Sequence, residues 1–136
     1  KGKTRKYGQW FTNSKGQKYG IRNGSGAVYL QSEYPHLYYG RSYCQLTWLD
    51  NYIKLGKMIN VDLANNPDLA LEPKNAANIL ITGMLTGAFT GMSLPRCIKT
   101  GTTQEFVNAR KIINGTDRDK LIAGYAVKFL YCLIVN

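Results

Sequence analysis

The sequence is short of acidic side chains. Its 136 residues hold 8 aspartates and glutamates against 18 lysines and arginines, which gives a net charge of +10. Basic residues crowd the first 22 positions, which contain no acid at all. A surface of this sign attracts polyanions such as nucleic acids, anionic lipids or the acidic polymers of a bacterial envelope. The alternative interpretation is a solvated basic arm without a partner.

Histidine and cysteine are also scarce. The chain has a single histidine, His36, and three cysteines, Cys44, Cys97 and Cys132. An odd number of cysteines at no metal-ligand spacing predicts neither a disulfide framework nor a metal site, and no cofactor is indicated. We expect thiols that are mostly buried, in a protein made in a reducing cytoplasm. His36 is expected in a surface loop.

Long apolar runs are missing as well. Residues 75–95 carry no charge, but asparagines, threonines and glycines interrupt them, so we expect no membrane span. No signal peptide is visible, and the first residue is Lys rather than Met, so a processed or partial chain is expected. The length predicts a single domain over residues 1–136.

Residues 1–37 form a basic region rich in turn signals. The stretches Gln9–Thr12 and Gln17–Ile21 flank a turn at Asn13–Gly16, a pattern that predicts a β-hairpin. Asn23-Gly24 predicts a second turn, followed by a third strand at Ala27–Leu30. The region lacks apolar runs of its own, so it is expected to lean on a helical body formed by residues 38–136.

Four helices are expected in that body. The first spans about Tyr43–Leu55 and is stopped by Gly56, the second begins at Pro73 and ends near Gly87, and the third spans about Thr103–Ile113. The buried face of the second helix is expected to consist of Ala76, Ala77, Leu80 and Met84.

The fourth helix has the clearest apolar pattern. Thr116–Asp119 resembles a capping box at its start. Its apolar stripe is expected to form the core of the protein and consists of Leu121, Ile122, Tyr125, Phe129, Cys132 and Leu133.

A cluster of polar side chains lies within the aromatic segment Tyr38–Tyr52. On a helix, Thr47 and Asn51 are four positions apart and project from one face, and Gln45 lies near the helix start. A helix that only needed to be buried would not carry this polar set among large rings. The alternative is a polar pair satisfied inside the helix packing.

Four stretches, taken in order, resemble the family 19 glycoside hydrolases, which are plant-type chitinases and their bacterial and phage lysozyme-like relatives. They are Tyr38–Tyr52, Val61–Leu69, Phe106–Gly115 and Ile122–Tyr125. The segment Arg110–Asp117 looks like the phage and bacterial branch, the endolysins. The resemblance implies a mainly α, lysozyme-like helical domain with a small N-terminal β-hairpin region. It implies hydrolysis of N-acetyl amino-sugar polymers, peptidoglycan or chitin, in a cell wall outside the cytoplasmic membrane.

The resemblance also assigns roles to individual residues. Thr47 matches a hydroxyl that helps to hold the attacking water. The matches to substrate-binding residues are Tyr39, Gln45, Asn51, Asn114, Arg110 and Arg118. For Asn114 the alternative is a plain helix C-cap. Ser42 departs from the family pattern, which usually has Gly there, and a positive φ at this position would make Ser costly.

Catalytic carboxylates are the part that the resemblance does not find. Metal-free glycoside hydrolysis normally needs two carboxyl groups, and the family places its general acid in a His-Glu motif that this sequence lacks. Lys1–Gly8 looks like the stretch that follows the second family Glu, so we expect both carboxylates on a missing N-terminal segment of the same gene product. The 136 residues alone are then inactive. Glu33, an acid in a loop near the signature, is the candidate within the chain; its alternative is an exposed loop charge.

Two other function classes stay open. One is a non-catalytic glycan- or protein-binding module derived from the same fold. The other is nucleic-acid binding through the basic N-terminal arm. No helix-turn-helix, zinc or stacking-sheet signature is present, so only salt-sensitive, sequence-blind retention of DNA is expected.

Overall fold

The computed structural model describes residues 5–134 and divides the chain into two compact units, residues 1–80 and 81–136. Lys1 and Lys3 of the basic arm, and the first half of the Lys1–Gly8 stretch, lie outside the described residues. The described chain is mainly helical with a small N-terminal antiparallel sheet, which confirms the expected class.

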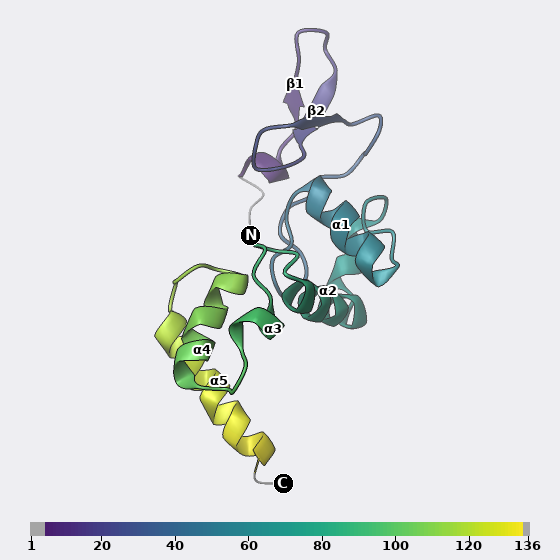
Figure 1. Ribbon diagram of the computed structural model, residues 1–136. Coiled ribbons are helices and arrows are strands. Elements are labelled where there is room, and N and C mark those ends of the chain that lie inside the picture. The colour runs from purple at the N-terminus through teal and green to yellow at the C-terminus, as the bar shows by residue number, and fades with distance from the viewer. Residues whose placement is uncertain (1–4, 135–136) are drawn as a thin grey trace. The chain divides into compact units, whose positions relative to one another are not determined.

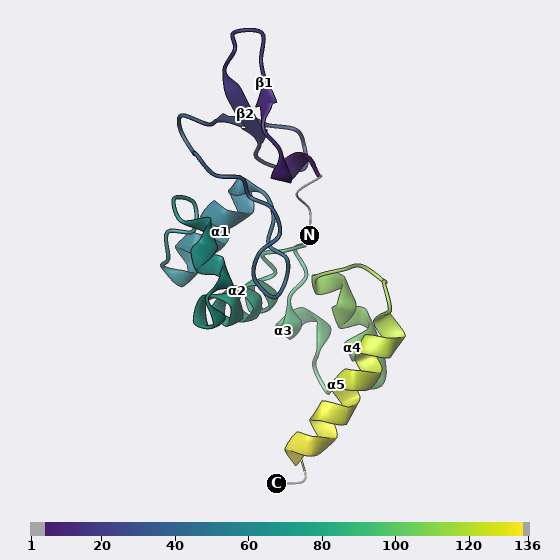
Figure 2. The same cartoon turned by 180° about the vertical axis from the view of Figure 1, so that it is seen from behind.

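The first unit begins with a short 3-10 turn, η1 (Lys6–Gly8), and a three-stranded sheet. The strands are β1 (Phe11–Thr12), β2 (Lys18–Ile21) and β3 (Val28–Leu30), paired in the order β1-β2-β3 (Figures 1 and 2). Asn13 Oδ1 accepts hydrogen bonds from the backbone N–H groups of Lys15 and Gln17, at 3.0 and 2.9 Å. This side-chain bonding closes the first turn, as expected for Asn at such a position.

Aromatic rings connect the sheet to the first long helix. The ring of Tyr29 lies edge-on to those of Trp10 and Tyr38, with centroids 5.7 and 5.6 Å apart. The ring centroids of Tyr38 and Tyr52 are 5.1 Å apart. Tyr29, Tyr38 and Tyr52 are all buried, and the Tyr38 hydroxyl donates to the Ala64 carbonyl at 2.6 Å. This row of rings is the core of the first unit.

The first long helix, α1, spans Leu49–Ile59 rather than the expected Tyr43–Leu55. Residues 40–48 form a loop because Ser42, Gln45 and Trp48 have positive φ, which an α-helix cannot contain. Gly56 does not end the helix. It is buried within α1, and the left-handed Asn60 closes the C-terminus.

The second long helix, α2, spans Pro73–Thr86, as expected, and follows the 3-10 turn η2 (Pro67–Leu71). The left-handed Gly87, with a φ of 75°, follows its last residue. The expected buried face is wrong in three of four positions, because only Ala76 is buried while Ala77, Leu80 and Met84 are half-buried. The fully buried residue is Ile79, so the face that packs is rotated from the one expected. Helix α2 crosses the division between the units.

The second unit contains α3 (Leu94–Cys97), α4 (Thr103–Ala109), the 3-10 turn η3 (Arg110–Ile112) and α5 (Asp119–Ile134). Helices α4 and α5 pack side by side (Figures 1 and 2). The third expected helix is therefore present, with its last turn tightened. The expected capping box at Thr116 is wrong, since Arg118 directly precedes α5. A capping box exists instead at α4, between Thr102 and Glu105.

The apolar stripe of α5 does not form a core, contrary to expectation. Phe129 is 72% exposed and Leu133 is 77% exposed, and of the described α5 side chains only Ala123 is buried. The buried residues of this unit are small or isolated and include Ala88, Cys97 and Ile112. Within residues 5–134 no helix combines the length and hydropathy needed to cross a membrane.

The cysteines of the described chain form no disulfide with one another. Cys97 is buried, Cys44 is half-buried and Cys132 is exposed. The expectation of mostly buried thiols therefore fails for Cys132, which lies on the exposed stripe of α5.

Candidate functional site

The loop of residues 40–48 carries an unusual density of backbone strain. Ser42, Gln45 and Trp48 have φ values of 65°, 57° and 71°. A left-handed conformation costs a non-glycine residue about 1–2 kcal/mol. Two hydrogen bonds between the backbones of Arg41 and Leu46, at 3.1 and 2.7 Å, close the loop. Strain of this kind persists only where the surroundings hold the backbone, and it gathers at functional sites.

Arg41 is the side chain that holds this loop. It is 5% exposed, and its guanidinium donates to Asp68 Oδ1 at 2.8 Å and to the Leu37 carbonyl at 3.0 Å. The same guanidinium lies 3.9 Å from the centre of the Tyr39 ring. Tyr39 is therefore fixed on one side by a buried cation. Asp68 belongs to η2, so contacts distant in sequence determine the shape of the loop.

Tyr52 supports the same loop from α1. Its hydroxyl donates to the Tyr39 carbonyl at 2.8 Å and accepts from Arg41 at 3.3 Å. Burial raises the pKa of Tyr52 to about 12, so the hydroxyl keeps its proton and its donor role at any physiological pH.

Two of the predicted residues, Thr47 and Asn51, lie at the junction between the loop and α1. Asn51, in the first turn of α1, donates from Nδ2 to the Thr47 carbonyl at 2.9 Å. The exposed Gln45 packs its side chain against Gly40, where an added Cβ would come within 2.7 Å of Gln45 Oε1. Thr47 lies before α1, so the prediction that it shares a helix face with Asn51 is wrong. The two residues are close because the Asn51 amide reaches back to the loop.

Three predicted residues belong to the second unit. Arg110 donates from Nε to the Asp117 carbonyl at 2.8 Å, and Asn114 donates from Nδ2 to Asp117 Oδ2 at 3.2 Å. Arg118 is exposed and left-handed, with a φ of 52°. The C-cap of η3 is Ile113 rather than Asn114, and Asn114 shares Asp117 with Arg110. The idea that Asn114 and Gln45 face one groove stays a prediction, since the two belong to different units.

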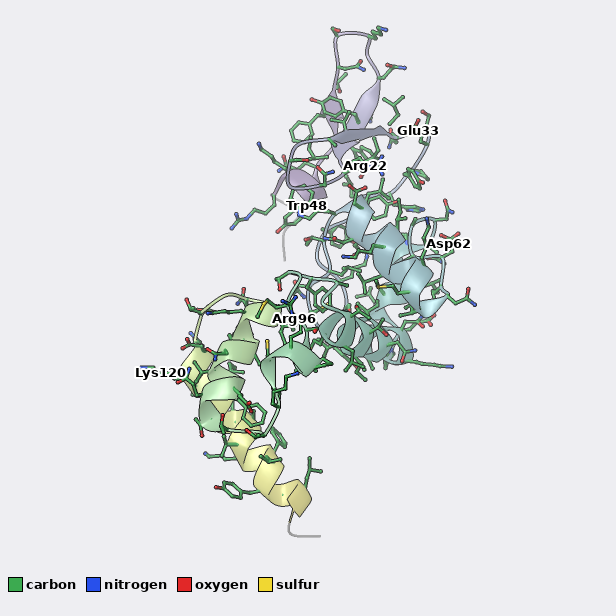
Figure 3. The ribbon with its side chains drawn as sticks, viewed as in Figure 1. Arg22, Glu33, Trp48, Asp62, Arg96 and Lys120 are labelled. Atoms are coloured by element: carbon green, nitrogen blue, oxygen red, sulfur yellow. The ribbon has the colours of Figure 1, made fainter. Side chains whose placement is uncertain are left out.

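Glu33 is exposed, and its Oε2 accepts the backbone N–H of Leu30 at 3.2 Å. In Figure 3 it lies apart from Trp48, which precedes α1. These observations fit an exposed loop charge, and a catalytic role for Glu33 stays a prediction. Of the other acids in this unit, Asp50 binds Arg22 at 2.7 Å and Asp68 binds Arg41.

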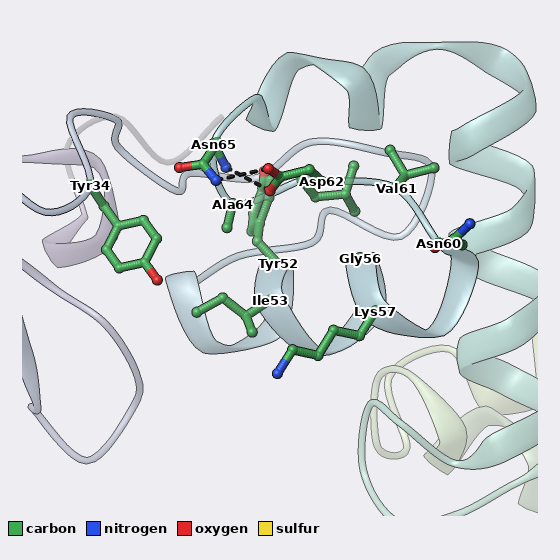
Figure 4. A pocket seen from close by; sticks show the side chains of 11 residues that line it. Tyr34, Tyr52, Ile53, Gly56, Lys57, Asn60, Val61, Asp62, Ala64 and Asn65 are labelled. Carbon is green, nitrogen blue, oxygen red and sulfur yellow. Dashed lines mark hydrogen bonds between the residues drawn. The ribbon is translucent and has the colours of Figure 1, made fainter.

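The sequence interpretation missed a pocket of about 580 Å³ on the first unit (Figure 4). It lies between the C-terminal half of α1 and the following loop. Its lining residues are Tyr34, Tyr52, Ile53, Gly56, Lys57, Asn60, Val61, Asp62, Leu63, Ala64 and Asn65. None of the predicted site residues is among them. Five of the lining residues, Val61–Asn65, lie in the Val61–Leu69 stretch that carries the family resemblance, but that stretch did not predict a cavity.

Two curated plant proteins are similar to parts of this chain. Endochitinase A2 of Pisum sativum is 30% identical over 112 residues, which cover 65% of this chain and 35% of the pea protein. Endochitinase 1 of Theobroma cacao is 59% identical over 37 residues, which cover 26% of this chain and 12% of the cacao protein. The chain therefore spans about a third of the length of the pea relative and less of the cacao relative. It has a distant, partial similarity to plant endochitinases.

No protein-family model matches the sequence, and no solved structure matches the fold.

Proposed function

We propose that this chain is the cleft-bearing portion of a family 19 type glycoside hydrolase that acts on N-acetyl amino-sugar polymers. The observation that carries the proposal is the strained loop of residues 40–48, which contains Gln45 and is joined at Thr47 to the Asn51 side chain by a hydrogen bond. The partial similarity to plant endochitinases supports the same assignment. In this proposal the protein is made in the cytoplasm and acts on the polysaccharide of a cell wall, outside the cytoplasmic membrane.

The side chains at the loop suit an acetamido sugar. An N-acetyl group offers one hydrogen-bond donor and one acceptor, and the amides of Gln45 and Asn51 can meet both. Tyr39, fixed by Arg41, offers a ring face for the apolar side of a sugar. In this proposal the Thr47 hydroxyl helps to hold the attacking water. Asn114, Arg110 and Arg118, in the second unit, are proposed as further sugar-binding residues on the family resemblance alone.

Hydrolysis also needs an acid and a base. With water as the nucleophile and inversion at the sugar carbon, one carboxylic acid protonates the leaving oxygen while a carboxylate activates the water. The carboxylates around the loop are committed to arginines: Asp50 to Arg22 and Asp68 to Arg41. We therefore propose that both catalytic carboxylates come from a part of the gene product outside these 136 residues. The chain by itself then binds glycan without cleaving it.

Calorimetric titration of the 136-residue chain with chitin oligomers and with soluble peptidoglycan fragments tests the cleft. We expect Gln45→Ala and Asn114→Ala each to weaken binding about tenfold, the effect of losing one hydrogen bond to the sugar. Gln9→Ala removes an exposed amide outside the loop and serves as the control. Equal affinities for all these proteins would show that Gln45 and Asn114 do not bind the glycan.

A second candidate is a glycan- or protein-binding module that never catalyses hydrolysis. This candidate is favoured by the ion pairs of Asp50 with Arg22 and of Asp68 with Arg41, because both carboxylates already have structural partners. Loss of turbidity of a peptidoglycan suspension, or release of soluble oligomers from chitin, separates the two candidates when the full-length gene product is used. Product release supports the hydrolase, and glycan binding without release supports the module.

A further inference from the structure

The pocket beside α1 is separate from the proposed sugar cleft. An α-helix turns by about 100° per residue, so Ile53, two positions after Asn51, lies on nearly the opposite side of α1. Ile53, Lys57 and Asn60 line the pocket, whereas Asn51 reaches toward the Thr47 loop. A molecule bound in the pocket would therefore lie away from Asn51, while Tyr52 both lines the pocket and donates to the Tyr39 carbonyl.

Opposite charges line two walls of this pocket. Figure 4 shows Lys57 on one side, Asp62 and Asn65 on the other, and Tyr34 at one end. Lys57 and Asp62 form no ion pair with each other in the part of the chain that the structure describes. Both side chains are exposed, so each can meet a charged group of a ligand.

Hydrogen bonds within the protein hold the Asp62 carboxylate in place on its side of the pocket. Asn65 donates to Asp62 from its backbone N at 3.1 Å and from its Nδ2 at 2.8 Å. These hydrogen bonds lower the pKa of Asp62 and keep it ionised. A carboxylate has about four acceptor positions, and Asn65 and the backbone N–H of Ala64 occupy some of them, so acceptor capacity remains for a ligand. Buried Tyr52 and Leu63 add apolar lining.

We propose that this pocket binds a short zwitterionic peptide. Its carboxylate meets Lys57, its ammonium meets Asp62, and its apolar part lies against Ile53 and Tyr34. The inference rests on the proposed function, which leaves two polymers open. Chitin is an uncharged sugar polymer, whereas peptidoglycan carries short peptides with free carboxylates and free amines. The pocket therefore assigns peptidoglycan as the substrate class.

Titration with a peptidoglycan stem tetrapeptide that carries no sugar tests the inference, with the dissociation constant measured by calorimetry. The side-chain amide signals of Asn60 and Asn65 in NMR spectra report where the peptide binds. We expect Lys57→Gln and Asp62→Asn each to weaken binding about tenfold. Lys74→Gln, which removes an exposed lysine of α2 outside the pocket, should leave the affinity unchanged. The Asp62→Asn substitution keeps an oxygen that can accept from Asn65, so the fold of the loop should be preserved.

A tetrapeptide that does not bind overturns the inference, as does equal binding by the Lys57→Gln and Lys74→Gln proteins. The same proteins are titrated with chitin oligomers to separate the two proposals. If oligomer binding depends on Gln45 but not on Lys57, and the tetrapeptide does not bind, the pocket proposal is overturned and the sugar cleft is retained. Tetrapeptide binding together with oligomer affinities that are insensitive to Gln45→Ala and Asn114→Ala removes the cleft alone.

Discussion

Ser42 shows how one residue carries the strain of the candidate site. It has a φ of 65° at the position where the family pattern usually has Gly, so the concern about a positive φ is confirmed. The residue is buried, and its hydroxyl donates to the Ala76 carbonyl at 3.3 Å. A hydrogen bond thus offsets part of the conformational cost, which lets Ser occupy a position suited to Gly.

Comparison of Ser42→Gly with Ser42→Ala measures that strain directly. Both changes remove the bond to Ala76, and only Ala keeps a Cβ in the left-handed region. We expect Ser42→Gly to have a free energy of unfolding about 1 kcal/mol higher than Ser42→Ala. Urea denaturation followed by circular dichroism gives both values. A Gly variant less stable than the Ala variant would contradict the assigned backbone conformation.

At the scale of the elements, two helical glycines show that the same residue type serves different ends. Gly56 lies inside α1, where an added Cβ would come within 2.6 Å of the Val61 carbonyl oxygen. Gly124 lies inside α5, where an added Cβ would have no neighbour within 4 Å. Gly56 permits the close return of the chain after α1, which forms one wall of the pocket, whereas Gly124 has no such role.

The two substitutions to alanine should therefore have opposite signs. Gly56→Ala should destabilise the protein by about 1–3 kcal/mol, because backbone must move to make room. Gly124→Ala should stabilise it by about 0.5–1 kcal/mol through helix propensity. The midpoints of urea unfolding check both values. Stabilisation by Gly56→Ala would show that the chain does not pack closely there.

The capping box of α4 predicts a response to acid. Partial burial acts to raise the pKa of Glu105, but the backbone N–H groups of Thr100, Thr102 and Gly101 donate to its carboxylate and hold the pKa below its ordinary value of 4.5. A lowered pKa in the folded state gives stability that is present above pH 4.5 and is lost as the pH falls further. Thr102→Ala should cost about 1 kcal/mol at neutral pH.

Thermal unfolding of the protein and of Glu105→Gln at several acidic pH values tests this. The native protein should lose stability more steeply than Glu105→Gln as the pH falls from about 5 to 3. Parallel loss in both proteins would mean that Glu105 contributes nothing to acid unfolding.

At the scale of the whole molecule, the net charge of +10 predicts association with polyanions. Arg5, Lys6, Lys15 and Lys18 are exposed in the described part of the basic region, whereas Arg22 is paired with Asp50. Fluorescence anisotropy should show DNA binding that weakens steeply between about 50 and 200 mM salt, equally for unrelated sequences. A tenfold preference for one sequence would favour nucleic acid as the true partner.

Local signals in the sequence determined much of the architecture. The Asn13–Gly16 turn, Pro73 at the start of α2 and Gly87 at its end act through their own backbones and nearest neighbours, so the hairpin and α2 were predicted with nearly correct limits. The mainly helical class was implied by the family resemblance, and it agrees with the four helices expected from the sequence. The single-domain assignment stays a prediction.

Only the tertiary structure decided the form of the candidate site. Residues 43–48 have the spacing of a helix, yet the contacts of Arg41 with Asp68 and of Tyr38 with Ala64 hold this segment as a strained loop. Packing likewise chose Ile79 for burial and left Phe129 exposed. These outcomes depend on groups 26 or more positions apart, which short-range periodicity does not encode. The pocket combines both ranges. Lys57 and Asp62 lie on opposite walls because the chain reverses at the left-handed Asn60, and Tyr34, which is distant in sequence, lies at one end only in the folded chain.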